Sequence, residues 1–121
     1  VLECLNGYLI LIERLSIKDN KIFDCFNFGP KEKNSKTVKQ LVEKMIDFWE
    51  GDWIDISNKD QFFESKSILL DVSKAKHLLN WEPFWDFNIT VEKTILWYKN
   101  YYLKKKSAIK SCVDDINSFM N

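Results

Sequence analysis

The chain has 121 residues with 18 basic and 18 acidic side chains, so its formal net charge is zero. This balance gives no electrostatic argument for a nucleic acid or a membrane surface as a partner. The apolar run at residues 9–12 ends at Glu13 and Arg14, far short of the roughly 18 apolar residues of a membrane span. The length is that of one small domain.

The first predicted element is an amphipathic helix over residues 2–15, whose apolar side chains recur at helical spacing as Leu2, Leu5, Leu9 and Ile12. The chain starts with Val1 rather than Met and opens directly on this helix. We therefore expect it to be the C-terminal piece of a longer protein, truncated at its N-terminus inside a domain.

Three short strands are predicted from apolar runs bounded by turn residues. They cover residues 23–28, which a turn at 29–30 follows, and then residues 53–56 and 68–70. Because helices are predicted between them, the sequence favours an α/β class in a loose sense. We expect a mostly helical lobe with short strands.

A second helix is predicted over residues 39–49, with Gly51 as its end. Thr37 and Gln40 have the spacing of a capping box. Val38 could equally close a brief strand, in which case the helix would begin one residue later.

Asp71 follows the last predicted strand and is expected to cap a short helix over residues 72–79. Asn80 stands where a helix often ends in a left-handed residue, and Pro83 prevents the helix from continuing. Trp81 lies in the extended turn between them, where we expect it to fill a gap in the core.

Two further helices are predicted from helical spacing of apolar residues. The first begins at about Asn88, with Asp86 or Asn88 itself as its cap. The second covers residues 107–120, and the pattern does not identify what it packs against. We divide the chain into a lobe at 1–103 and an appended C-terminal helix at 104–121.

Four runs stand out by their order and spacing: Val1-Leu2-Glu3 with Gly7-Tyr8-Leu9, Phe26-Asn27-Phe28-Gly29-Pro30, Leu70-Asp71 with Ser73-Lys74-Ala75, and Glu92-Lys93-Thr94 with Trp97-Tyr98. Together with Leu78, Trp81 and Pro83 they resemble the C-terminal part of extended short-chain dehydrogenases/reductases that act on nucleotide sugars. Each run is weak alone. All four in order make a fairly specific match.

The resemblance implies the substrate-binding lobe of an NAD-dependent nucleotide-sugar 4,6-dehydratase. Such enzymes oxidise C4 of the sugar, remove water across C5 and C6 and return the hydride to C6. The product is a 4-keto-6-deoxy sugar nucleotide for surface polysaccharide synthesis. NAD would lie on an N-terminal Rossmann lobe outside this chain, so we expect the chain alone to bind no NAD and to be inactive. Another epimerase or reductase of the family, or a non-catalytic helical interaction module, are the alternatives.

The resemblance also suggests three substrate-binding residues, in a lobe that closes over the substrate. The family's histidine-glutamate-alanine looks like residues 63–65, so Glu64 carries over, whereas Phe63 departs from the pattern. A solvated loop carboxylate is the simpler interpretation of Glu64. Lys66 could donate to a phosphate. Asn27 resembles an asparagine at the end of a family strand, and we favour a turn-stabilising role for it over a pocket wall.

Motifs for other chemistry are missing from the sequence. Its three glycines are too far apart for a nucleotide-binding loop. His77 is the sole histidine, so we expect it on the surface rather than in a catalytic triad or a metal site. Tyr98 and Tyr102 lie at or beyond the end of the last run, and only Lys106 follows at the spacing of the family's tyrosine and lysine. We therefore assign no catalytic residue.

The cysteine and aromatic residues favour packing roles. Cys4, Cys25 and Cys112 are odd in number and far apart, which fits a reducing cytoplasm, and we expect each to be a small buried hydrophobe. The five Trp, nine Phe and four Tyr are not interleaved with basic residues, so core packing is favoured over base stacking. Rings that would pack on the missing lobe would be exposed here, and a homo-oligomer is then an expected partner arrangement.

Overall fold

The computed structural model describes residues 1–17, 24–31, 35–56, 69–104 and 106–120. Over these ranges the chain forms five α-helices and no strand: α1 (Leu2–Ser16), α2 (Val38–Ile46), α3 (Ser73–Leu79), α4 (Phe87–Tyr102) and α5 (Ala108–Met120). None of these helices is long and apolar enough to cross a bilayer. The described part of the chain is therefore mostly helical.

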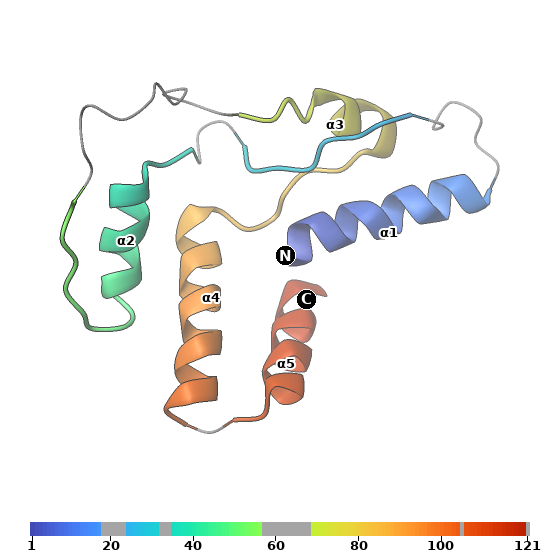
Figure 1. Ribbon diagram of the computed structural model, residues 1–121. Coiled ribbons are helices and arrows are strands. Elements are labelled where there is room, and N and C mark those ends of the chain that lie inside the picture. Colours follow the sequence, from blue (N-terminus) through green and yellow to red (C-terminus); the bar gives the residue numbers. More distant parts are fainter. Residues whose placement is uncertain (18–23, 32–34, 57–68, 105, 121) are drawn as a thin grey trace.

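The helices form two groups (Figure 1). In one group α4 lies between α2 and α5 and packs against both, whereas in the other α1 packs against α3. Segment 24–31 runs beside α3 in this second group. Residues 80–86 then lead from α3 into α4 and so connect the two groups.

The core lies in the group of α1 and α3. Trp81 is 1% exposed, and it forms a buried cluster with Ala75 and Leu79 of α3. Partly buried side chains pack against this cluster from α1, from segment 24–31 and from the residue before α3, namely Ile10, Leu11, Phe26, Phe28 and Val72. The prediction that Trp81 fills a gap in the core is confirmed.

A close approach between Gly7 and Phe28 joins α1 to segment 24–31. The Phe28 ring meets Trp81 edge to face at a centroid distance of 5.0 Å and Tyr8 at 5.4 Å. An added Cβ at Gly7 would lie 2.4 Å from two ring carbons of Phe28, closer than carbon atoms approach. Glycine at this helical position therefore makes room for the ring.

Local sequence signals explain the ends of α2. The predicted capping box is confirmed, because the Gln40 N–H donates to Thr37 Oγ1 at 3.2 Å and the Thr37 N–H donates to Gln40 Oε1 at 3.0 Å. Val38 is the first helical residue, so the later start is wrong. The helix also ends at Ile46, earlier than predicted. The N–H groups of residues 48 and 49 both donate to the Met45 carbonyl, which tightens the last turn.

At the start of α3 the predicted N-cap at Asp71 is wrong by one residue, whereas at its end the predicted left-handed residue is confirmed. Val72 is the N-cap, and Asp71 Oδ1 accepts from the Ser73 N–H at 2.8 Å from just outside the helix. Asn80 ends the helix with φ 54° and ψ 34°, the left-handed conformation that the sequence predicts.

The two C-terminal helices form where they are predicted. Asp86 caps α4, because its Oδ1 accepts from the Ile89 N–H at 2.9 Å. Helix α5 packs against α4, and its Phe119 ring meets the rings of Phe84 and Trp85 edge to face. These contacts identify the partner of α5 that the sequence pattern left open.

The predicted strands do not form in the described part of the chain. Residues 24–28, 53–56 and 69–70 have no regular secondary structure, and residues 23 and 68 lie outside the described ranges. Alternating apolar residues favour an extended backbone, but a strand also needs a neighbouring backbone to pair with. The described part of the chain therefore confirms the helices of the predicted α/β class but not its strands.

Candidate functional site

Asn27 is the one predicted substrate-binding residue within the described ranges, because Glu64 and Lys66 lie outside them. Its Nδ2 donates to the carbonyl oxygen of Asp71 at 3.2 Å, across 44 positions of sequence. This bond ties segment 24–31 to the residues before α3 and gives Asn27 a structural role. Substrate binding by the three residues stays a prediction.

A hollow of about 350 Å³ lies beside this bond, lined by Pro30 and residues 69–73. Gly29 lies close by, and a Cβ added there would be 3.5 Å from Leu70, an ordinary contact. Hydrogen bonds from the side chain and the backbone N–H of Ser73 lower the pKa of Asp71. Asp71 is therefore ionised at neutral pH, and its carboxylate can only accept hydrogen bonds.

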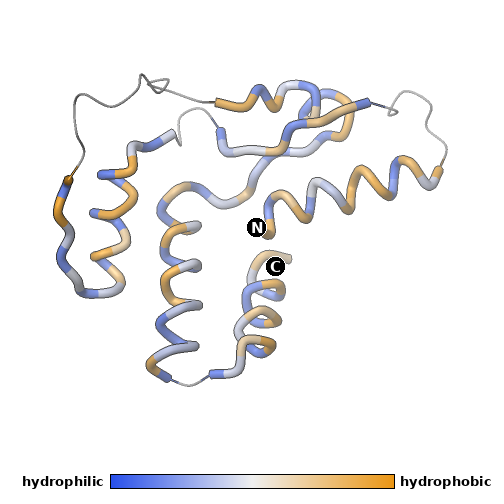
Figure 2. Tube along the Cα trace, viewed as in Figure 1, coloured by the Kyte–Doolittle hydropathy of each residue, from blue (hydrophilic) through white to orange (hydrophobic). Residues whose placement is uncertain are grey.

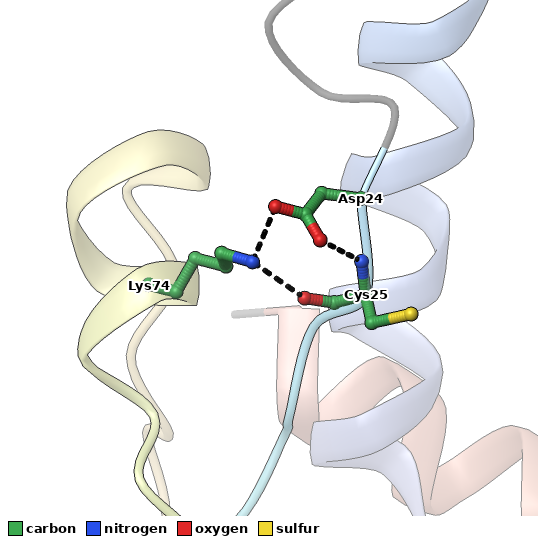
Figure 3. Close-up of polar contacts among 3 residues, drawn as sticks. All are labelled: Asp24, Cys25 and Lys74. Atoms are coloured by element: carbon green, nitrogen blue, oxygen red, sulfur yellow. Dashed lines mark hydrogen bonds and ion pairs between the residues drawn. The ribbon is translucent and has the colours of Figure 1, made fainter.

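Lys74 of α3 binds the first two residues of segment 24–31 (Figure 3). Its Nζ lies 2.5 Å from Asp24 Oδ2 and donates to the Cys25 carbonyl oxygen at 3.2 Å. It also stands over the Phe26 ring, 5.6 Å from the centroid. The hydrogen bond from Lys74 lowers the pKa of Asp24, helped by the Cys25 N–H.

Glu82 forms an ion pair with the other end of the segment. Its carboxylate pairs with Lys31 at 2.8 Å and with Lys76 of α3 at 2.5 Å. Hydrogen bonds from these two lysines lower the pKa of Glu82 to about 2. The segment that carries Asn27 is thus held by an ion pair at each end.

These ion pairs were not foreseen, although Lys74 belongs to one of the four runs. Lys74 and Asp24 are 50 positions apart, and no spacing rule relates residues at that distance. The signal that could have found them is charge placement, since Asp24 and Lys31 flank the apolar residues of the segment.

His77 and the three cysteines are the other side chains considered for a chemical role. His77 is exposed, as predicted, with Nδ1 2.7 Å from the Ser73 carbonyl oxygen. Cys4 is partly buried, but Cys25 and Cys112 are exposed free thiols, so the expectation of burial is wrong for these two. In segment 24–31, Phe26 and Phe28 pack against the core, whereas Cys25 is exposed. Within the described ranges no three His, Cys, Asp or Glu side chains gather as a metal site.

The aromatic side chains divide between core and surface. Trp81 is in the core, as expected from composition, but Phe84 is 73% exposed and Tyr102 63% exposed. Tyr8 on α1 and Tyr98 on α4 are about half exposed. Core packing therefore accounts for some of the aromatic side chains, and the others lie at the surface.

No family model matches the chain. Over 101 residues it is 35% identical to CDP-glucose 4,6-dehydratase of Salmonella typhimurium. The match covers 82% of this chain and 28% of that protein, so the chain spans less than a third of the relative's length. It confirms the predicted resemblance, and over most of its length the chain is similar to part of a CDP-glucose 4,6-dehydratase.

Proposed function

We propose that this chain is the C-terminal, substrate-binding lobe of an NAD-dependent nucleotide-sugar 4,6-dehydratase most like CDP-glucose 4,6-dehydratase. The observation that carries the proposal is the similarity over 101 residues. The reaction of the whole enzyme would be the loss of water from the sugar of CDP-glucose, giving CDP-4-keto-6-deoxyglucose. The product would feed polysaccharide synthesis in the cytoplasm.

The residues present do not fit an NAD site. Gly7 is packed against Phe28 inside α1, Gly29 lies beside Leu70, and Gly51 has no atom within 4 Å of an added Cβ. A dinucleotide site needs several glycines in one loop before a helix. The proposal therefore places NAD on an N-terminal Rossmann lobe and gives this chain the task of holding the sugar nucleotide.

The hollow beside segment 24–31 supports a role of this chain in holding the sugar nucleotide. Asp71 lines it, and an ionised carboxylate suits the hydroxyl groups of a sugar, because it accepts hydrogen bonds and repels phosphate. Asn27 fixes the wall through its bond to the Asp71 carbonyl. Glu64 and Lys66, which lie outside the described residues, are the further substrate-binding residues of the proposal, with Lys66 as a hydrogen-bond donor to the diphosphate.

The surface of α1 supports a large partner for this lobe. Leu5, Leu9 and Ile12 follow one another at helical spacing and are 46%, 66% and 61% exposed. Figure 2 shows hydrophobic positions along the whole helix. We propose that the Rossmann lobe covers this face, and self-association of the chain is the competing arrangement.

The test is calorimetric titration with CDP-glucose, GDP-mannose and dTDP-glucose. The chain is used alone and mixed with the N-terminal lobe of the Salmonella relative. Selective CDP-glucose binding by the mixture supports the proposal, as does its weakening by Glu64→Ala. Glu43→Ala, an exposed carboxylate on α2, serves as the control.

Equal or absent binding of all three nucleotides would overturn the proposal and favour a non-catalytic interaction module. Preference for another nucleotide sugar would favour a related epimerase or reductase. Turnover of CDP-glucose by the chain alone would contradict the expectation that the catalytic residues lie elsewhere.

A further inference from the structure

The end of the α4–α5 hairpin carries apolar side chains that the described elements leave uncovered. Tyr102 and Leu103 at the end of α4 are 63% and 59% exposed, and Ile109 at the start of α5 is 79% exposed. In Figure 1 this end of the two helices points away from α1 and α3. A lobe that covers α1 therefore does not account for the exposure of these side chains. We call this end the hairpin tip and define it by residues 102–104 and 109–110.

Lysines accompany the apolar side chains of the tip. Lys104 follows Leu103 directly, and Lys110 follows Ile109. Both lysines are exposed, and neither forms an ion pair within the part of the chain that the structure describes. The sequence contains no acidic residue from position 93 to position 113. The tip is therefore apolar and basic at once.

The acidic groups beside the tip reduce its positive charge without cancelling it. Asp114 of α5 pairs with Lys106 at 2.5 Å, and it attracts Lys110 from beyond ion-pair distance. Asp115 is partly buried and is attracted by the same Lys106. Segment 47–56, with its acidic residues, lies beside the body of α4 rather than at the tip (Figure 1). The lysines at positions 104, 106 and 110 thus outnumber the two aspartates, and Lys104 keeps its full charge for an external partner.

The arrangement of the aromatic rings favours a lipid surface over a nucleic acid. Tyr102 stacks on Tyr98 with an angle of 9° between the ring planes, and Tyr101 stacks on Trp97 at a centroid distance of 5.5 Å. Rings that stack on one another have less free face for bases, and aliphatic side chains such as Ile109 do not stack on bases. A bilayer interface takes up tyrosine and aliphatic side chains next to lysine, because the apolar groups enter the acyl boundary while the ammonium stays at the phosphates.

We propose that the hairpin tip docks onto the surface of an anionic lipid bilayer. Tyr102, Leu103 and Ile109 enter the boundary between headgroups and acyl chains, and Lys104 and Lys110 contact the anionic headgroups. The docking is peripheral, because no described helix is long and apolar enough to cross a bilayer. The zero net charge of the chain does not oppose it, since salt screens charges that lie more than about 8–10 Å from the surface. Docking at the tip does not require the nucleotide-sugar function.

The test is cosedimentation of the full 121-residue chain with lipid vesicles. One set of vesicles is pure phosphatidylcholine, and the other contains about 30% phosphatidylserine. We expect binding to the phosphatidylserine vesicles that weakens as salt is raised, and much weaker binding to pure phosphatidylcholine. Lys104→Gln and Lys110→Gln should each weaken binding by about fivefold, the factor that one lysine contributes near an anionic surface. Lys39→Gln, an exposed lysine of α2, is the matched control and should leave binding unchanged.

Ile109→Asp tests the apolar contact separately from the lysines. Its side chain is 79% exposed, so the fold does not depend on it. The substitution should weaken vesicle binding by about tenfold or more, because it removes an inserted apolar group and adds a negative charge. Ile54→Asp, at a position that is 84% exposed in segment 47–56, is the matched control. Circular dichroism of each variant checks that the helices are retained.

Equal binding to the two kinds of vesicle, or binding to neither, would overturn the proposal. Equal losses in Ile109→Asp and Ile54→Asp would also do so, because any apolar surface residue would then serve. Undiminished binding in both lysine variants would remove the role of the tip charge and overturn the proposal as well. Binding of a single-stranded oligonucleotide in place of vesicles would assign the tip to a nucleic acid instead.

Discussion

The two helix groups are held together differently. The group of α1, α3 and segment 24–31 has a buried centre at Trp81, and residues far apart in sequence meet there. The group of α2, α4 and α5 has Val91, Ile95 and Ser111 as its buried described residues.

Long cationic side chains link the helices of this second group. Lys99 donates to the Phe48 carbonyl oxygen at 2.9 Å, and Lys93 donates to Ser118. The comparison indicates that the first group depends on shape complementarity. The second combines the buried Val91 and Ile95 with these surface contacts.

The largest expected effect is the loss of Trp81. Trp81→Ala should lower the free energy of unfolding by about 3–5 kcal/mol, because it removes the centre of the buried cluster and leaves a cavity. Its Nε1 is buried and lacks a hydrogen-bond partner within the described ranges, so the ring contributes through packing. Urea unfolding followed by circular dichroism measures the change.

Trp97→Ala in the second group is the matched control for this prediction. Trp97 is partly buried and stacks on Tyr101, so its truncation should cost clearly less. Equal losses for the two variants would contradict a difference in packing between the groups.

The next effect concerns Gly7. Gly7→Ala should lower the free energy of unfolding by about 1–3 kcal/mol, because the new Cβ would overlap the Phe28 ring. Alanine is intrinsically the better helix residue by about 1 kcal/mol, so the sign of the change is decided by packing. Thermal unfolding of the variant measures it.

Gly51→Ala is the control, since nothing lies within 4 Å of its added Cβ. Combining Gly7→Ala with Phe28→Leu should recover part of the loss, because the smaller side chain makes room. A stabilised Gly7→Ala protein would show that segment 24–31 does not press on α1.

A smaller effect is expected at a helix cap in the second group. Asp86→Ala should cost about 1 kcal/mol, because it removes the acceptor for the Ile89 N–H at the start of α4. Asp52→Ala, at an exposed position outside the helices, should stay within about 0.5 kcal/mol of the parent. Chemical denaturation measures both, and equal effects would argue against a cap at Asp86.

The smallest effect concerns the ion pairs of Glu82, whose side chain is 42% exposed. Its pKa is lowered from 4.5 to about 2 by hydrogen bonds from Lys31 and Lys76. The contribution of these pairs is thus complete above pH 4.5 and is lost as the pH falls through about 2. Urea midpoints of the parent and Glu82→Gln should differ at about pH 6 and converge toward about pH 2. A constant difference over this range would contradict the assignment.

The elements that the sequence predicted well are those whose causes are local. The capping box at Thr37, the left-handed Asn80 and the cap at Asp86 each involve residues within a few positions, so they can be recognised without knowing the fold. The resemblance carried by the four runs was likewise available from the sequence, and the similarity to the Salmonella enzyme confirms it.

The predictions that failed depend on partners elsewhere in the chain. The strand predicted around Phe26 needed a neighbouring backbone, and a side-chain bond from Asn27 stands in that place instead. The burial of Cys25 depended on which alternate residues of its segment face inward. Neither choice is encoded in local spacing.

The amino-acid sequence by itself therefore determines the local structure and the resemblance to known proteins, because helix caps, helix ends and the four runs involve residues close together in the sequence. The fit of Gly7 to Phe28, the ion pairs at both ends of segment 24–31 and the hydrogen bond from the Trp85 N–H to Glu3 emerge once distant residues are brought together. Such contacts depend on the shape of the whole chain, since packing and charge act through space and are independent of separation in sequence.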